Sequence, residues 1–313
     1  MYYFIVNEHG GSGKAVRRWD IVKEIIEKKQ IPYKAYIPEY PGHATKIAEE
    51  ISLMQDNDIR LVVVGGDGTI NEVLNGIKDF DKIKFGLIPT GSGNDFSRGL
   101  NLPRHNPHKA IQIILDSKGT KKIDLGQVNI IDSDSEQKSQ PRLFGISSGF
   151  GLDALVGTTI NTAKIKIILN KLHMGKLSYA FLTVQTLFSM TTQNVSVSFD
   201  NQTPQFFKNL IFLAAMNFKA EGGGVPMAPK AKGDDGKLSI CIAANVPKWL
   251  TFLMFPFLIL GLHSKMKGFC IKDCRTMEIV SDKASVLHTD GEFGGNVKHV
   301  KFSCLESKLT VLV

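Results

Sequence analysis

Short apolar runs alternate with amphipathic stretches over the first part of the chain. Four runs predict strands: Tyr2–Val6, Tyr33–Ile37, Leu61–Val64 and Phe85–Ile88. Between them, apolar residues recur at helical spacing, which predicts helices around Val16–Ile26, over Ala44–Leu53 and over Ile70–Ile77. Strands separated by helices indicate βαβ units and a parallel sheet.

The pattern changes after about Asp124, where strand-like runs dominate. They are Gly126–Ile131, Leu143–Ser148, Val195–Phe199, Leu210–Met216, Leu238–Ala243, Met277–Val280 and Ser285–His288. Two helices are expected, Lys176–Met190 and Lys248–His263, and Asp132–Gln140 is expected to be a loop. We therefore predict an α/β domain over residues 1–125 and a β-rich domain, of sandwich form, over 126–299. The last strands, Val300–Cys304 and Leu309–Val313, could return to either domain.

Composition excludes two classes of protein. The 43% apolar and 22% charged residues are unlike a disordered chain. The net charge of +8 favours anionic partners, but without a long Lys/Arg run it is no nucleic-acid signature.

Four cysteines, at 241, 270, 274 and 304, lack the ligand set of a zinc site. No secretory signal is apparent, so we expect reduced thiols and a cytoplasmic protein.

The longest apolar run is Trp249–Leu262, which has 14 residues and contains Pro256. A membrane-spanning helix needs about 20 apolar residues. This segment is therefore expected to be a core helix or an interfacial one.

The most informative segment is Val64–Glu72, VGGDGTINE, where an apolar strand ends and a helix begins at once. Its three glycines let the backbone approach a ligand, and N–H groups at a helix start suit phosphate. Asp67 stands at the carboxyl end of a parallel strand, where α/β proteins bind ligands. A carboxylate among phosphates suits Mg²⁺ or a hydroxyl to be deprotonated. The simpler alternative is a tight turn with Asp67 as N-cap.

Two further Gly-rich loops follow strands. Pro89–Phe96, PTGSGNDF, would face the first loop across one crevice. Asn7–Lys14, NEHGGSGK, lacks the spacing of a P-loop. A Gly-rich turn with Lys14 at the next helix start can still hold phosphate, although a plain turn is the alternative.

Taken together, GGDGTINE, TGSGNDF, the Asn7 loop and the late Asp290-Gly291-Glu292 resemble the diacylglycerol kinase catalytic-domain family nearly end to end. The resemblance is closest to its soluble bacterial lipid kinases, which are relatives of sphingosine and ceramide kinases. GGDGT alone is shared with NAD kinases and is similar to a phosphofructokinase loop. The resemblance implies a nucleotide-binding α/β domain of NAD-kinase and phosphofructokinase type, a β-sandwich domain and an active site between them. It also implies phosphoryl transfer from ATP, with Mg²⁺, to a hydroxyl of diacylglycerol or a similar lipid.

The same resemblance implies site residues. ATP is expected at Asn7, Ser12, Gly13, Lys14, Gly65, Gly66, Asp67, Gly68, Thr69, Ile70, Asn71, Ser92, Asn94 and Asp95. Gly42-His43-Ala44 resembles a family helix start, but Pro38 stands where members often place a Thr near the nucleotide. The general base on the lipid hydroxyl is expected at Glu292, with Asp290 assisting and Asp67 a further candidate.

Two Mg²⁺ sites are implied. Asp67, Asp95 and Asp124 are expected in a Mg²⁺–water network at the active site, whereas an Asp124 facing solvent is the alternative. A structural Mg²⁺ is expected in Ala228–Leu238, at the Asp235 side chain and the Lys232 and Lys237 carbonyls. Oxygen-only ligation suits Mg²⁺, although Asp-Gly also marks an ordinary turn.

The acceptor lipid must be mostly apolar. Ala163–Met190 interleaves lysines with apolar residues and could meet an anionic membrane, with Trp249–Leu262 beside it; core helices are the alternative. We expect a lipid at the membrane surface as partner, peripheral membrane contact and no nucleic acid, and a homodimer stays open. The rival functions are an NAD kinase and a non-catalytic nucleotide or lipid sensor.

Overall fold

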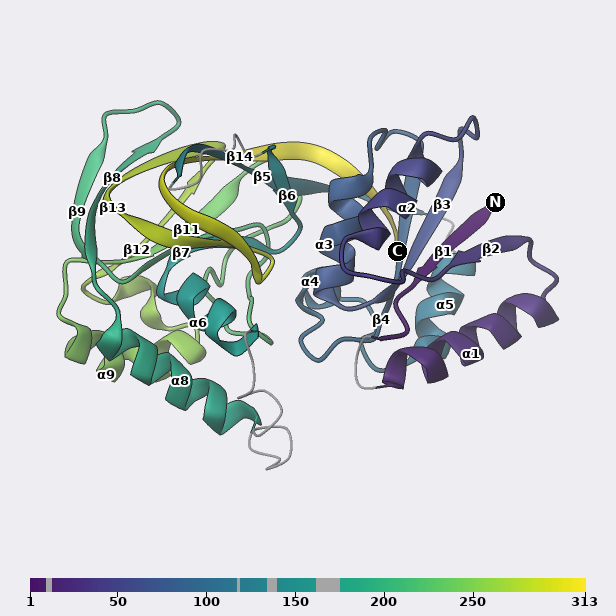
Figure 1. The fold of residues 1–313 in the computed structure, drawn as a ribbon, viewed down its shortest axis with the longest axis horizontal. Coiled ribbons are helices and arrows are strands. Elements are labelled where there is room, and N and C mark those ends of the chain that lie inside the picture. Colours follow the sequence, from purple (N-terminus) through teal and green to yellow (C-terminus); the bar gives the residue numbers. More distant parts are fainter. Residues whose placement is uncertain (10–12, 117–118, 134–139, 162–174) are drawn as a thin grey trace.

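A computed structural model describes the chain except residues 10–12, 117–118, 134–139 and 162–174. It has two halves side by side (Figure 1). The first half alternates strands and helices: β1 Tyr2–Val6, α1 Lys14–Lys28, β2 Tyr33–Tyr36, α2 His43–Ser52, β3 Ile59–Gly65, α3 Asp67–Gly76, β4 Ile83–Pro89, α4 Asp95–Gly99 and α5 Pro107–Asp116.

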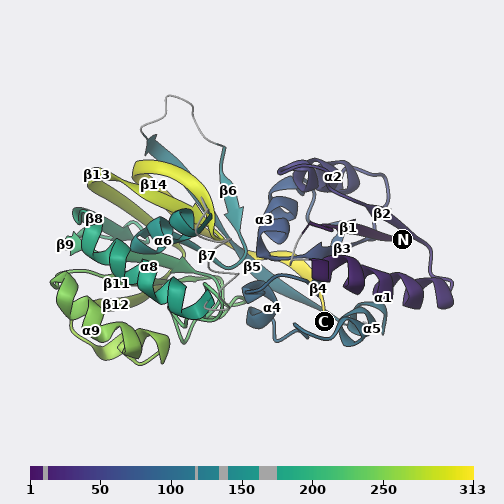
Figure 2. The ribbon, with the colours of Figure 1, turned by 60° about the horizontal axis from the view of Figure 1, so that its bottom comes forward.

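The four strands of this half pair in parallel in the order β4-β3-β1-β2. Figure 2 shows α2 and α3 on one face of the sheet, and α1 and α5 on the other. Strand β3 contributes to both layers, because Leu61 and Val63 pack toward α2 and α3 while Val62 and Val64 pack toward α1 and α5. Burial on both faces explains its continuous apolar sequence.

The second half is mainly antiparallel. Its elements are β5 Thr120–Ser133, β6 Arg142–Phe144, β7 Ser147–Gly151, α6 Leu152–Asn161, α8 Gly175–Ser189, β8 Gln193–Phe199, β9 Gln205–Leu210, β10 Phe212–Met216, β11 Leu238–Ala243, α9 Lys248–Ile259, the 3₁₀ helix η2 His263–Lys265, β12 Phe269–Cys274, β13 Thr276–Thr289 and β14 Glu292–Leu312. Phe144, Phe150, Phe199 and Phe302 lie in its core. Helices α6, α8 and α9 cover the outer face of β10 and β11.

Strands β5 and β14 connect the halves. They pair antiparallel along most of their length. β14 also pairs antiparallel with β13, and Thr310 and Val311 near its end pair in parallel with β4. The chain end therefore lies in the parallel sheet, and these two strands hold the halves against each other.

Several predicted strands differ from those observed. The run Leu143–Ser148 was expected as one strand but forms β6 and β7, because main-chain N–H groups between them bond to the Asp290 carboxylate. Leu210–Met216 is divided at Ile211, whose N–H bonds to the Ala243 carbonyl.

Other strands are longer than expected. Met277–Val280 and Ser285–His288 are parts of β13, and the two C-terminal runs are parts of β14. In both strands a register shift interrupts the local apolar pattern while the pairing continues. Helices α4, α5 and α6 and strands β9 and β12 were not predicted. Most of the expected loop Asp132–Gln140 lies outside the described residues.

Candidate active site

The loops after β1, β3 and β4 meet at the carboxyl edge of the parallel sheet. Asn7 Nδ2 donates a hydrogen bond to Thr69 Oγ1 at 2.8 Å. A Cβ on Gly66 would stand 3.2 Å from the Cα of Gly91, so a larger residue would crowd the point where these two loops touch. The three Gly-rich loops of the sequence are thus brought to one edge, next to the N-terminus of α3.

The Asp67 carboxylate, at the start of α3, is held by main-chain N–H groups at the start of α4. It accepts hydrogen bonds from the N–H groups of Asp95, at 3.1 Å, and Phe96, at 3.2 Å. Burial, aided by the charge of Asp95, raises the pKa of Asp67 to about 6 against the effect of these hydrogen bonds. A divalent cation would stabilise the charged form, so this donor set fits Mg²⁺.

Asp95 is buried and links the two halves. Its Oδ2 accepts the Gly223 N–H of the β-rich half at 2.6 Å, and its Oδ1 accepts Arg98 Nε at 3.0 Å. A Cβ on Gly93 would stand 3.3 Å from Asp67 Oδ2 and 3.4 Å from Asp95 Oδ2. Both carboxylates therefore border one position, which a Cβ at residue 93 would partly fill.

Asp290 is the most heavily bonded carboxylate of the site. It accepts the N–H groups of Gly145 (2.8 Å), Ile146 (2.8 Å) and Ser147 (3.0 Å), and Asn71 Nδ2 at 2.9 Å. Burial raises the pKa of Asp290, and the hydrogen bonds lower it. Because four donors occupy its lone pairs, this carboxylate fixes its turn and is poorly placed to accept a substrate proton.

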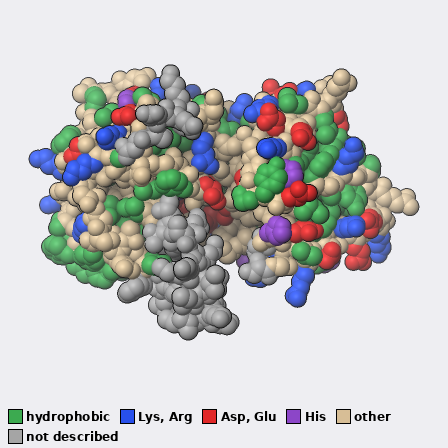
Figure 3. Space-filling view, in the orientation of Figure 1, with side chains coloured by type: hydrophobic (Ala, Val, Ile, Leu, Met, Phe, Trp, Pro, Cys, Tyr) green, Lys and Arg blue, Asp and Glu red, His purple; other side chains and the backbone are tan. Residues whose placement is uncertain are grey.

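Glu292, two residues later, is exposed. A Cβ on Gly68 would stand 3.0 Å from Glu292 Oε1, so this carboxylate faces the first turn of α3. Within the described part of the chain, no protein group donates a hydrogen bond to it. Figure 3 shows acidic side chains gathered between the two halves. Of the two carboxylates of Asp-Gly-Glu, Glu292 is the one free to interact with a ligand.

Two residues expected at the nucleotide use their side chains elsewhere. Asn71 donates to Asp290 and to the Leu143 carbonyl. Ile70 is buried in the core beside the sheet, and its N–H bonds to the Gly66 carbonyl. These groups shape the loop and offer a nucleotide little direct contact.

The other residues expected at ATP lie around the mouths of the loops. Gly13, Lys14 and Ser92 are exposed there, and Ser12 lies outside the described residues. Asn94 Oδ1 is buried and has no hydrogen-bond partner among the described residues. The site thus retains polar groups that a nucleotide could satisfy.

Pro38 stands where family members often place a Thr near the nucleotide. It is buried and donates no hydrogen bond.

Three side chains that the sequence analysis did not select meet beside the Asp290–Glu292 turn. They are Asp153 at the start of α6, Glu221 after β10 and His288 of β13. One oxygen or nitrogen atom of each side chain, of the kind that can bind a metal, lies within 4.8 Å of the others. His288 Nε2 is 3.3 Å from Asp153 Oδ2, and the Gly291 N–H donates to His288 Nδ1 at 3.1 Å. The only sequence signal was the place of His288 in HTDGE, since its partners are distant in the chain.

The charges within this cluster shift the pKa values of His288 and Glu221. Desolvation lowers the pKa of His288, but the hydrogen bond and charge of Asp153, with the charge of Glu221, raise it to about 9. Burial raises the pKa of Glu221 to about 7. In the neutral ring that accepts from Gly291, Nε2 is the donor, and in the charged ring both nitrogens are donors. Neither form offers a lone pair to a metal. The bond from Nε2 to Asp153 can form in both, whereas the bond from the Gly291 N–H requires the neutral ring.

Asp124 is buried and so does not face solvent, which was the alternative expectation. Its Oδ2 accepts the Gly236 N–H at 2.7 Å and its Oδ1 accepts the Ser307 N–H at 2.7 Å. Among the described residues, Asp67, Asp95 and Asp124 do not gather their carboxylates within metal-binding distance of one another. A network of these three through Mg²⁺ and water stays a prediction, and Asp124 is held by the loop before β11.

That loop carries the second expected metal site. The exposed Asp235 accepts the Lys237 N–H at 3.2 Å. Partial burial raises the pKa of Asp235 against this hydrogen bond, and the charges of Asp273 and Asp124 add to the rise. Such crowding of carboxylates suits a cation, and ligation through the Lys232 and Lys237 carbonyls stays a prediction.

Family comparisons agree with this arrangement. Residues 1–128 match the family model of the diacylglycerol kinase catalytic domain. Residues 146–313 match the model of the YegS C-terminal NAD kinase beta sandwich-like domain. The chain is 28% identical over 300 residues to YtlR of Bacillus subtilis (strain 168), named as a presumed lipid kinase, with 94% of each chain covered. It is 29% identical over 289 residues to the diacylglycerol kinase of Staphylococcus haemolyticus (strain JCSC1435), covering 91% of this chain and 81% of that one.

Solved structures share the fold. A presumed diacylglycerol kinase from Bacillus anthracis str. Sterne superposes with a TM-score of 0.75 at 20% identity, covering 99% of this chain and 94% of that one. Yeast NADH kinase superposes with a TM-score of 0.52 at 11% identity, covering 99% and 82%. The predicted fold class, a parallel α/β domain plus a β-sandwich of NAD-kinase type, is confirmed.

Proposed function

The chain belongs to the diacylglycerol kinase catalytic-domain family, and we propose that it transfers the γ-phosphoryl group of ATP to a hydroxyl of diacylglycerol or a similar lipid. The observation that carries the proposal is the position of Glu292. Its unpaired carboxylate reaches from the β-rich half to Gly68 of the GGDG loop. A base for the acceptor hydroxyl thus stands beside the place where the phosphates would lie.

The residues of the α/β half would bind and orient the nucleotide. The loops after β1, β3 and β4 and the N-terminus of α3 suit its phosphates. Asp67 and Asp95 would hold Mg²⁺, which, when bound, neutralises charge on the transferring phosphoryl group. Glu292 would take the proton of the attacking hydroxyl, while Asp290 holds the turn.

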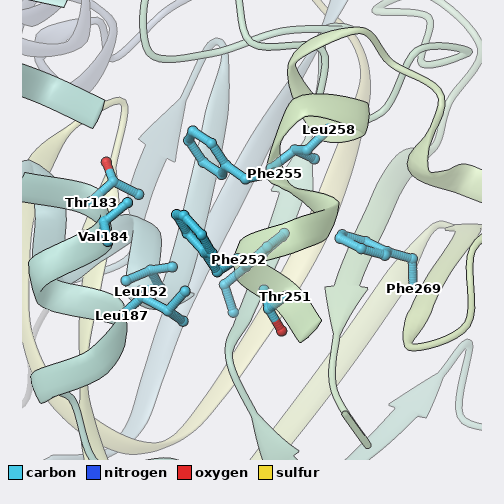
Figure 4. A pocket seen from close by; sticks show the side chains of 10 residues that line it. Leu152, Thr183, Val184, Leu187, Thr251, Phe252, Phe255, Leu258 and Phe269 are labelled. Atoms are coloured by element: carbon cyan, nitrogen blue, oxygen red, sulfur yellow. The ribbon is translucent and has the colours of Figure 1, made fainter. Parts of the chain in front are cut away.

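An apolar cavity in the β-rich half suits the acceptor's hydrocarbon chain. It lies between α8 and α9 and is lined by Leu152, Thr183, Val184, Leu187, Phe212, Thr251, Phe252, Phe255, Leu258 and Phe269 (Figure 4). Leu152 lines this cavity, and its neighbour Asp153 contacts His288 beside the Glu292 turn. A polar site and an apolar cavity that begin at adjacent residues suit a molecule with a hydroxyl head and an apolar tail.

The cavity is narrow in this conformation. Its free volume is about 30 Å³, which is room for roughly one water molecule. A lipid chain would therefore enter only if α8 and α9 separate, and side chains such as Phe252 and Phe255 would have to turn aside.

The test is transfer of labelled γ-phosphate from ATP with Mg²⁺. The acceptors are diacylglycerol, monoacylglycerol, phosphatidylglycerol and a sphingoid base in mixed micelles, and NAD⁺ in solution. We expect a labelled lipid, and a loss of at least about a hundredfold in rate in Asp67→Ala. Asp20→Ala, an exposed carboxylate on α1, is the matched control and should behave as wild type.

The alternatives give different outcomes. Labelled NADP in place of lipid would identify an NAD kinase, the activity whose fold is shared. No product from any acceptor, together with tight ATP binding, would indicate a non-catalytic sensor and would overturn the proposal.

A further inference from the structure

The outward side of α9 is apolar where a helix facing water is normally polar. Trp249 is 58% exposed, Leu253 55% and Leu260, just after the helix, 68%. Phe252, Phe257 and Leu262 are also exposed. A helix at a protein surface ordinarily presents charged or polar residues on this side. Figure 3 shows hydrophobic side chains gathered over α9 at the lower left of the molecule. We call these six residues the outer α9 patch.

The helix itself is firmly docked. Thr251, Met254 and Leu258 are buried on its inner side, and Leu258 packs in the cluster with Phe212 and Cys241 of the sheet. Lys248 Nζ donates to the Phe188 and Met190 carbonyls at the end of α8. The patch is therefore a fixed surface feature, and its exposed apolar area calls for a partner.

The length of α9 excludes one role. It has 12 residues with Pro256 inside, and no helix in the described part of the chain is long and apolar enough to cross a membrane. A short apolar helix that cannot span a bilayer can lie in its interface with one side inserted. Trp is common at that depth because its ring is amphipathic.

The charges around the patch identify the partner. The sequence has no Asp or Glu between Gly236 and Lys272. Lys265 and Lys267, which follow the patch, are exposed. Apolar side chains that lysines follow in the chain, in a segment without carboxylates, match a bilayer that contains anionic lipid.

We propose that the outer α9 patch inserts into the interface of an anionic membrane, with Lys265 and Lys267 at the phosphates. This deepens the proposed function and rests on it in one respect, namely that the acceptor lipid resides in that membrane. The same helix contributes Phe252 and Phe255 to the apolar cavity, so insertion would bring the cavity to the lipid layer.

Membrane insertion can be measured without catalysis by the fluorescence of Trp249, because the chain has just one other tryptophan to remove. Trp19 is 7% exposed in the α/β half, so Trp19→Phe leaves Trp249 as the reporter. With phosphatidylcholine vesicles that contain phosphatidylglycerol, we expect a blue shift of Trp249 emission and quenching by brominated acyl chains. Pure phosphatidylcholine vesicles should give much less of both, because the lysines would then lack anionic partners.

The patch variant is Leu253→Glu/Leu260→Glu, and its control is Leu53→Glu, equally exposed at 62% but at the end of α2 in the other half. We expect the patch variant to bind the anionic vesicles at least about tenfold more weakly and the control to bind normally. Lys265→Glu/Lys267→Glu should reduce binding to the anionic vesicles and leave binding to pure phosphatidylcholine vesicles unchanged. Thermal unfolding of each variant checks that it is folded.

The outcomes separate this inference from the proposed function. Lipid phosphorylation in micelles without any response of Trp249 to vesicles overturns the insertion and leaves the kinase assignment intact. A response of Trp249 to vesicles without phosphorylation of any lipid supports the insertion and overturns the kinase assignment. A concentration-dependent dimer that the patch variant abolishes, with no vesicle binding, would show that a second copy covers the patch and would also overturn the proposal.

Discussion

Asn71 Nδ2 donates a hydrogen bond to Asp290 Oδ2 across 2.9 Å, although the two residues are 219 positions apart in the sequence. Asn71 lies in α3, directly after the GGDG loop, and Asp290 precedes Glu292 in the turn between β13 and β14. This bond sets how close the proposed base stands to the loop that would hold the phosphates. Changes at either residue should therefore act on both stability and activity.

Asn71→Asp should be more harmful than Asn71→Ala. Alanine removes one donor from a buried carboxylate, whereas aspartate puts a second carboxylate within hydrogen-bond distance of it. We expect losses in the free energy of unfolding of about 1–2 kcal/mol for alanine and about 3 kcal/mol for aspartate. Urea unfolding measures both. Asn57→Asp, at an exposed position, is the control, and equal effects of the two Asn71 variants would contradict the assigned contact.

Glu292→Gln and Asp290→Asn should have opposite profiles. Glu292 is exposed, so its amide variant should change the free energy of unfolding by less than about 0.5 kcal/mol while kcat falls at least about a hundredfold. An amide at position 290 cannot accept all four hydrogen bonds, so Asp290→Asn should lose about 2–4 kcal/mol of stability. Melting curves and reaction rates of the two variants, measured side by side, distinguish the two roles. If the position 290 variant melts normally and the 292 variant unfolds, the two roles are reversed.

The stability of the metal-free protein should depend on Asp67 in a definite direction. The pKa of Asp67 is raised from 3.8 to about 6, so between these pH values the folded state holds a proton that the unfolded state has lost. The Asp67 contribution is therefore complete below about pH 4 and lost as the pH rises through about 6.

This dependence can be isolated by difference. The free energy of unfolding of wild type minus that of Asp67→Asn should fall by about 2 kcal/mol between pH 4 and 7 without Mg²⁺. If Mg²⁺ binds the ionised carboxylate, as proposed, its addition at pH 7 should restore much of the loss in wild type only. A difference that does not change with pH would contradict the raised pKa.

Removal of Mg²⁺ tests the loop before β11. If Asp235 ligates a structural ion, a chelator should lower the melting temperature of wild type by several degrees more than that of Asp235→Ala, which keeps only the response of the Asp67 site. The neighbouring Asp234 pairs with Lys121 at 2.8 Å and provides the control, since Asp234→Ala should still respond to the chelator. A wild-type melting temperature that the chelator leaves unchanged would remove the metal from this loop.

Local sequence signals were sufficient for most of the α/β half. Buried parallel strands such as β3 are continuously apolar, and helices such as α3 repeat apolar residues at their own period, so each element is visible within its own segment. The β-rich half was harder because its boundaries depend on distant partners. The gap between β6 and β7 exists because Asp290 binds the intervening N–H groups, and a register shift within β14 interrupts a pattern that pairing with β5 continues through.

Reading the residues in order is enough to find the chemical groups of the site: Gly-rich loops after three strands, and carboxylates at Asp67, Asp95, Asp290 and Glu292. Which of these carboxylates is free to act depends on the folded chain, since hydrogen-bond donors from remote segments occupy some and leave others open. Asp290 is saturated by Asn71 and the main chain after β6, and Asp124 is held by Gly236 and Ser307. Glu292 alone of the Asp-Gly-Glu carboxylates faces Gly68, because the bond between Asp290 and Asn71 holds its turn against α3.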